Sequence, residues 1–68
     1  MNRLEQYAEE FRRRMAHTED FRLLCRELHG AARMAQALGS KEGEALADQL
    51  HQEASRAWFD AQAGKEGR

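Results

Sequence analysis

The sequence predicts an all-α fold, and three observations support this prediction. The 68-residue chain contains no proline, so no residue type that breaks helices by its own geometry is present. Alanine, glutamate, arginine and leucine predominate, and these residues lose little conformational freedom in a helix. Apolar residues recur every three or four positions over most of the chain, as they do on one face of an amphipathic helix.

The first apolar stripe runs from Leu4 to Met15, and two interpretations of it remain open. One is a single long helix over about 3–38, which we favour because no glycine or proline lies at the junction. The other is a break near 17, after which Thr18 would cap a new helix with Glu19 and Asp20 in its first turn. A break is plausible because the first stripe would lie roughly 120° away from the next stripe on a continuous helix.

The rest of the chain predicts an antiparallel helical hairpin. A second stripe, Phe21 to Leu38, has the near-heptad spacing of a helix that packs on a neighbour. Gly39 suits the left-handed position after a helix, and Ser40 suits the N-cap of the next. The third stripe predicts a helix over about 41–62. We therefore expect one domain over 1–63 and a disordered tail over 64–68.

A hairpin of this size needs further support. A domain this small buries only about 60% of the surface that its unfolded chain exposes, and the single cysteine, Cys25, rules out an intramolecular disulfide. We expect a homodimer that forms a four-helix-bundle-like assembly, with the Leu4 to Met15 segment lying on the second subunit. The residues expected in the core or the dimer contact are Phe11, Met15, Phe21, Leu24, Leu28, Leu38, Leu46, Leu50 and Trp58.

The cysteine, the histidines and the carboxylates do not form a pattern that predicts an enzyme. Cys25 and His29 have a spacing compatible with two metal ligands, but His17 and His51 belong to no second ligand pair. The carboxylates lie mostly where a solvated helix face would place them. We expect no catalytic residues, no metal and no cofactor.

Charge and hydropathy restrict the partners and the compartment. The formal net charge of −1 gives no bulk attraction to nucleic acid or to an anionic membrane. The N-terminus lacks the apolar run of a signal peptide, and no stretch is apolar enough to span a bilayer. We expect a cytoplasmic protein, in the host cytoplasm if it is phage-encoded.

Five residues are candidates for a partner-binding surface. Phe59 projects roughly 160° away from the centre of its own stripe, and Leu23 and Met34 are also off theirs. Exposed aromatic and methionine side chains are enriched at contact surfaces. The predicted surface comprises Leu23, Met34, Phe59, Arg22 and Arg26.

The core positions around the Gly39 turn follow a known pattern. They are Phe21, Leu24, Leu28, Ala31, Ala35 and Leu38 before the turn, and Leu46, Ala47, Leu50, His51, Ala54 and Trp58 after it. Over about 50 residues the chain thereby resembles the Rop family of plasmid copy-number regulators, helical hairpins that dimerise into four-helix bundles. The resemblance implies a Rop-like dimer.

The resemblance also bears on the ligand. That family binds RNA through polar, basic and aromatic side chains, and the corresponding surface here holds Glu19, Leu23, Glu27 and Met34. Leu23 and Met34 stand where that family has polar side chains, and this difference favours a protein partner over RNA. In size and predicted shape the chain is also similar to small phage-encoded inhibitors of host regulators, including quorum-sensing anti-activators that bind a transcription factor.

The sequence therefore favours a small non-enzymatic regulatory protein that binds and inhibits a partner protein, such as a host regulator or transcription factor, by covering its surface. One alternative is a Rop-like nucleic-acid-binding dimer that uses Arg12, Arg13, Arg14, Arg22 and Arg26. The other alternative is a structural or chaperone subunit of a larger assembly.

Overall fold

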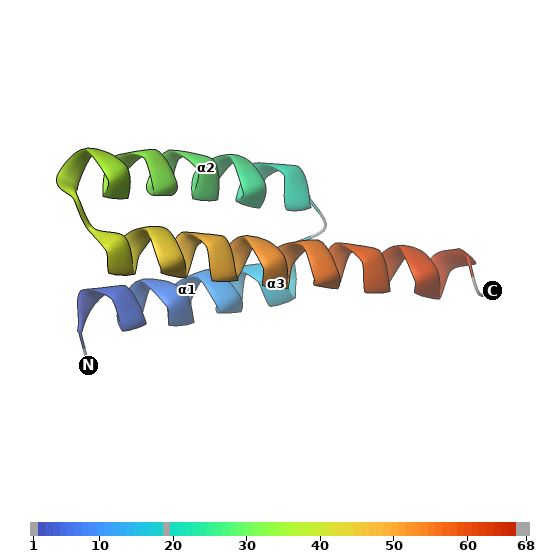
Figure 1. The fold of residues 1–68 in the computed structure, drawn as a ribbon. Coiled ribbons are helices and arrows are strands. Elements are labelled where there is room, and N and C mark those ends of the chain that lie inside the picture. The colour runs from blue at the N-terminus through green and yellow to red at the C-terminus, as the bar shows by residue number, and fades with distance from the viewer. Residues whose placement is uncertain (1, 19, 67–68) are drawn as a thin grey trace.

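The computed structural model describes residues 2–18 and 20–66, and these form three α-helices without a strand (Figure 1). Helix α1 spans Arg3–His17, α2 spans Phe21–Leu38 and α3 spans Lys41–Glu66. The all-α prediction is confirmed. The prediction of a single long helix over 3–38 is wrong, because the first two apolar stripes belong to separate helices.

The chain breaks between α1 and α2 through local hydrogen bonds. Thr18 leaves α1 with extended backbone angles (φ −103°, ψ 149°), and its hydroxyl accepts a hydrogen bond from the N–H of Asp20 at 3.1 Å. The Asp20 carboxylate then accepts from the N–H of Arg22 at 3.2 Å and caps α2. The alternative of a break near 17 thus describes the chain, although the cap is Asp20 rather than Thr18. Glu19 lies outside the described residues.

The break allows α1 to fold back onto the hairpin and bury its apolar stripe. Phe11 is fully buried, Ala8 is nearly so, and Tyr7 and Met15 pack beside the core. Burying a phenylalanine side chain stabilises a fold by about 1.5–3 kcal/mol, which exceeds the gain from continuing a helix through a few more residues. The segment from Leu4 to Met15 therefore packs on its own chain and needs no second subunit to cover it.

The turn between α2 and α3 has the predicted geometry. Gly39 adopts the left-handed conformation (φ 72°, ψ 24°), and its N–H donates to the carbonyl of Gln36 at 3.1 Å. The Ser40 hydroxyl accepts from the N–H of Gly43 at 3.0 Å, as an N-cap does. Gly43 also lets the two helices approach closely, because a Cβ there would lie 3.1 Å from the Cβ of Ala35.

The core lies where the three helices meet. Its buried members are Ala8, Phe11, Leu24, Leu28 and Leu50, and Tyr7, Met15, Phe21 and Leu46 pack partly buried against them. Leu38 and Trp58 were expected among the core or dimer contacts, but in the single chain they are 76% and 41% exposed. Trp58 lies beyond the part of the hairpin that α1 covers, whereas Leu38 lines a groove together with Leu4 and Tyr7 of α1.

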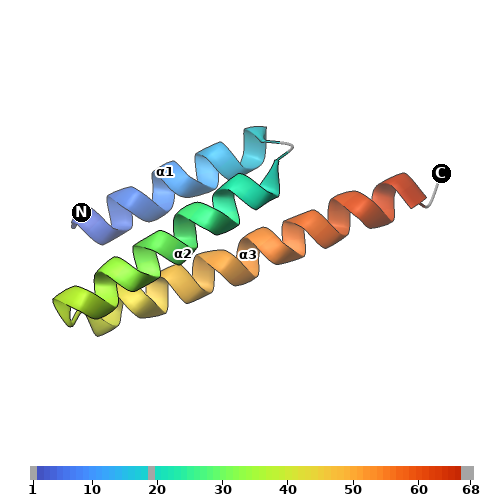
Figure 2. The ribbon, with the colours of Figure 1, turned by 90° about the horizontal axis from the view of Figure 1, so that it is seen from above.

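Helix α3 is the longest of the described helices and extends past the connection between α1 and α2 (Figures 1 and 2). Its 26 residues end at Glu66, beyond the predicted end at 62, while Gly67 and Arg68 lie outside the described residues. The molecule is accordingly elongated, with principal extents of 45 × 22 × 15 Å. The last turns of α3, beyond Phe59, form an overhang that extends past the start of α2 (Figure 1).

Leu50→Ala is expected to destabilise the fold strongly. The Leu50 side chain is fully buried between the helices, and removing such a side chain costs about 2–5 kcal/mol because a cavity remains. The free energy of unfolding of a domain this small is about 5 kcal/mol, so the variant should be largely unfolded. Urea unfolding followed by circular dichroism measures this change.

Leu23→Ala is the matched control for this prediction. The chemical change is identical, but Leu23 is 61% exposed, so the free energy of unfolding should change by less than about 0.5 kcal/mol. Equal losses in the two variants would contradict the position of the core.

Candidate functional site

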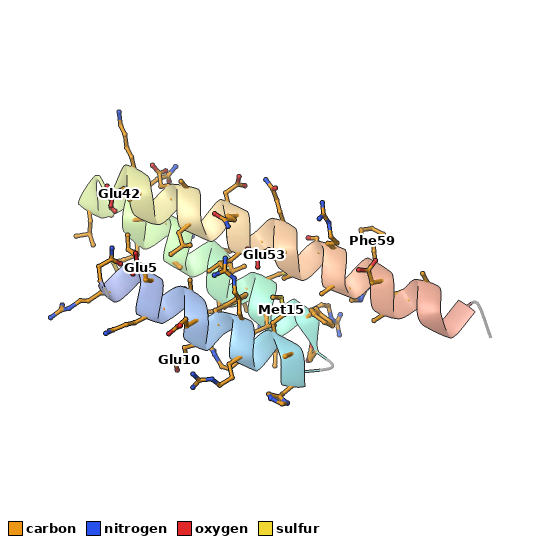
Figure 3. The ribbon with its side chains drawn as sticks, turned by 90° about the horizontal axis from the view of Figure 1, so that it is seen from below. Glu5, Glu10, Met15, Glu42, Glu53 and Phe59 are labelled. Carbon is orange, nitrogen blue, oxygen red and sulfur yellow. The ribbon has the colours of Figure 1, made fainter. Side chains whose placement is uncertain are left out.

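The structure divides the five predicted partner-binding residues between two sides of the α2–α3 hairpin. Met34 lines a groove whose walls come from all three helices, which we call the Met34 groove. Arg22 and Phe59 line a second groove, formed by α2 and α3 alone, which we call the aromatic groove. Figure 3 shows Phe59 on the edge of α3 away from α1. The five residues therefore do not form one surface.

The Met34 groove is almost wholly apolar and has a volume of about 250 Å³. It is lined by Leu4, Tyr7, Ala31, Met34, Ala35, Leu38, Ser40, Gly43, Leu46 and Ala47. The two side-chain hydroxyls in its wall are already engaged, since Tyr7 donates to Glu27 and Ser40 accepts from the N–H of Gly43. The groove thus offers a ligand apolar surface and few free polar atoms.

The rim of the Met34 groove carries exposed apolar side chains. Met34 and Leu38 are 62% and 76% exposed, and Leu23 lies on the same side of α2 further toward its start. Between them, Gly30 leaves open space, because a Cβ there would meet no atom within 4 Å. Glu27, ion-paired with Arg14, stands between Leu23 and Gly30 on this side, so the continuous apolar part of the rim runs from Met34 to Leu38.

Two ion pairs fix α1 against the hairpin. The guanidinium of Arg14 donates to both carboxylate oxygens of Glu27 at 2.7 Å, and the hydroxyl of Tyr7 donates to the same carboxylate at 2.8 Å. Arg12 forms a similar two-bond contact with Glu53 on α3, at 2.9 and 2.8 Å. Glu53 is labelled between α1 and α3 in Figure 3. Both arginines thus bind carboxylates that belong to other helices.

The Glu27 cluster shifts the protonation of its members. Burial, the hydrogen bond to Glu27 and the charge of that carboxylate together raise the pKa of Tyr7 to about 12. The hydrogen bonds from Arg14 hold the pKa of Glu27 below its usual value. Glu27 is therefore charged near neutral pH and accepts the hydrogen bond from Tyr7, which lines the Met34 groove.

The aromatic groove has a volume of about 270 Å³ and lies where α3 passes the start of α2. Phe21, Cys25 and Ala54 contribute to its walls. Trp58 and Phe59 stand at its rim with their ring centroids 5.0 Å apart and their planes at 76°, and Phe59 is 64% exposed. Arg26, one turn after Arg22 on α2, is exposed and lines neither groove.

Sequence reasoning missed the contribution of α1 to the Met34 groove. Leu4 and Tyr7 share the helix face of Phe11, and this spacing was visible in the sequence. Their role required the knowledge that α1 folds back beside α2. The prediction that Leu38 is a core residue has a similar cause. Its position on the apolar stripe does not reveal that the hairpin ends at the next residues.

Metal-binding and membrane-spanning features are absent from the described part of the chain. Between residues 2 and 66, with Glu19 excepted, no three ligating side chains come together. Cys25 lies in the aromatic groove, and His29 lines a neighbouring cavity with His51. No helix in the same ranges combines the length and the apolar character that a bilayer crossing requires.

No family model, no curated protein and no solved structure matches this chain. Of the resemblance to the Rop family, the structure supports the coarser part, a small all-helical protein, with three helices in place of two.

Tyr7 is expected to ionise with a pKa of about 12 in the folded protein, well above the ordinary value of 10.0. It is the single tyrosine of the chain, so ultraviolet absorption at alkaline pH reports it alone. Because its pKa is higher in the folded protein, its contribution to stability is complete below pH 10 and is lost as the pH rises toward 12. Circular dichroism on the same samples separates ionisation of the folded protein from unfolding.

Glu27→Gln should lower the pKa of Tyr7 because it removes the carboxylate charge. The value should nevertheless stay above the ordinary one, since burial is the largest cause of the shift. Glu9→Gln is the control, because Glu9 is exposed on α1, the helix that carries Tyr7. This change should leave the titration of Tyr7 unchanged. Ordinary titration of Tyr7 with full helicity would contradict the described cluster.

Proposed function

We propose that this protein is a small non-enzymatic regulator that binds a partner protein through the Met34 groove and inhibits that partner by covering its surface. The observation that carries the proposal is the groove itself. It is almost wholly apolar, about 250 Å³ in volume, and bordered by Met34 and Leu38 at 62% and 76% exposure.

The chemistry of this surface suits a protein better than a small polar ligand. Contiguous apolar patches of more than a few hundred Å² are uncommon on a monomer unless they contact another macromolecule. Methionine adapts its shape to a partner at low cost because its side chain is unbranched and polarisable. The polar atoms that a small metabolite would need are engaged elsewhere, as the hydroxyl of Tyr7 is with Glu27.

The form of the groove favours an amphipathic helix as the bound element of the partner. On α2 the groove is lined by Ala31, Met34, Ala35 and Leu38, which span about two helical turns. A helix laid along the groove would insert apolar side chains at intervals of three and four residues. A host regulator or transcription factor that uses such a helix for assembly would be inhibited by its occlusion.

RNA is less well suited to the described surface. Arg12 and Arg14 belong to the basic run that the nucleic-acid alternative requires, and each is bound by a carboxylate of another helix. A phosphate would have to displace Glu53 or Glu27 before either arginine could contact it. The formal net charge of −1 adds no general attraction for a polyanion.

Met34→Glu is expected to weaken partner binding at least about tenfold, because it places a charge in an apolar contact that excludes water. Tagged wild-type and variant proteins are used to capture the partner from lysate with and without RNase, and the captured protein is then titrated in purified form. The variant should keep the wild-type melting temperature, since Met34 is exposed.

Ala37→Glu introduces the same charge on the same helix at an exposed position that lines neither groove. Its partner binding should equal that of the wild type. Capture that RNase abolishes, or equal affinity of the Met34→Glu and wild-type proteins, would sink the proposal.

A further inference from the structure

The side of the hairpin away from α1 carries two charged stripes. On α2, Arg22, Arg26, His29 and Arg33 recur at intervals of three and four residues and therefore share one side of the helix. On α3, the corresponding stripe is Glu44, Asp48, His51, Ser55 and Trp58. Arg22, His29 and all five α3 residues line the grooves on this side. One stripe is basic, and the other is acidic near the turn and aromatic further along.

Among the described residues, the opposite charges of these two stripes form no ion pair with each other. In the described ranges, ion pairs join Arg12 to Glu53 and Arg14 to Glu27. Asp48 accepts a hydrogen bond from Gln52, its neighbour on the same helix. Of the α2 arginines, Arg22 lines the aromatic groove, and within the described ranges neither ion pair involves Arg22, Arg26 or Arg33.

The turn at Gly39 fixes which residues stand at the same height along the hairpin. Phe21 and Trp58 line one end of this side together, and His29 and His51 line its middle. Counting from the turn at the helical rise per residue, Arg33 stands at a height between Glu44 and Asp48.

We propose that two copies of this chain associate through this side, with α2 of each copy lying antiparallel on α3 of the other. The two-fold axis is then parallel to the helices, and residues at equal height face each other. Arg33 of one copy meets Glu44 and Asp48 of the second copy. Arg22 meets Trp58 of the second copy, where a guanidinium can stack on the indole.

The charge pattern selects this pairing over the other two-fold arrangement. If α2 lay antiparallel on α2 of the second copy, Arg22 would face Arg33, and like charges would meet twice in each dimer. Pairing α2 with α3 replaces these repulsions with attractions. It also makes every adjacent pair of helices in the four-helix layer antiparallel, which aligns their dipoles favourably.

The exposed area supports a second copy as the occupant. The chain exposes 5639 Å², against about 4,400 Å² for a typical compact monomer of its mass. A standard protein interface removes roughly 800 Å² from each partner, so the excess is large enough to supply one. Trp58 and Phe59 on α3 are 41% and 64% exposed.

The proposed interface leaves the Met34 groove free. That groove opens on the α1 side of the hairpin, so each copy in the dimer could still bind one partner protein. The proposed dimer and the proposed function can therefore be tested independently. Met34→Glu should leave self-association unchanged.

Sedimentation equilibrium of the full chain tests the proposal. The wild type should sediment as a dimer, and Arg33→Glu should weaken dimerisation about tenfold, because at both symmetry-related sites an attraction to Glu44 and Asp48 becomes a repulsion. In the rejected α2-on-α2 pairing the same change would strengthen the dimer. Arg13→Glu is the matched control, since Arg13 is exposed on α1 and lines neither groove.

A mixing experiment separates the interface from folding defects. Asp48→Arg alone should also weaken the dimer, whereas an equimolar mixture of the Arg33→Glu and Asp48→Arg proteins should form a heterodimer in which the opposite charges meet again. Trp58, the single tryptophan, should shift its emission to shorter wavelength as this heterodimer forms. A monomeric wild type at all accessible concentrations, a dimer unaffected or strengthened by Arg33→Glu, or no recovery on mixing would overturn the proposal.

Discussion

The contact of Phe11 with the leucines of the hairpin is the constraint on which the rest of this structure depends. Phe11, Leu28 and Leu50 are the largest fully buried side chains among the described residues, and each comes from a different helix. A chain of this length has one core, so the position of α1 follows from this layer. Because α1 covers one side of the hairpin, the Met34 groove has walls from all three helices. The aromatic groove lies on the side that α1 does not cover and has walls from α2 and α3 alone.

The ion pairs of α1 have a different role from the core. Arg12, Arg14, Glu27 and Glu53 are all partly exposed, and pairs of this kind contribute little to the free energy of folding. Their two-bond geometry fixes the rotation and height of α1 on the hairpin. The buried layer thus holds α1 in place, and the carboxylates determine which of its residues face the Met34 groove.

The parts of the fold that were predictable from the sequence have local causes. Gly39 and Ser40 marked their turn because a left-handed residue and a capping hydroxyl are properties of single positions. The break between α1 and α2 was ambiguous, because Thr18 and Asp20 compete with a segment of good helix formers and burial of Phe11 decides the outcome. Periodicity placed Trp58 on the same stripe as Leu50, but it cannot show where the neighbouring helices end. That Leu4 and Tyr7 line the Met34 groove was likewise not predictable, because it depends on the packing of α1 against the hairpin.

The overhang of α3 has a consequence for local stability. Fewer than about a dozen residues form a helix weakly in water without tertiary support, and the turns beyond Phe59 extend past the start of α2 (Figure 1). Amide protons there should exchange with solvent far faster than those near Leu50, so the protein carries a gradient of opening free energy along a single helix. A macromolecule that binds the overhang would slow amide exchange there toward the rate near Leu50. Exchange at the far end of α3 would therefore show whether the overhang is bound.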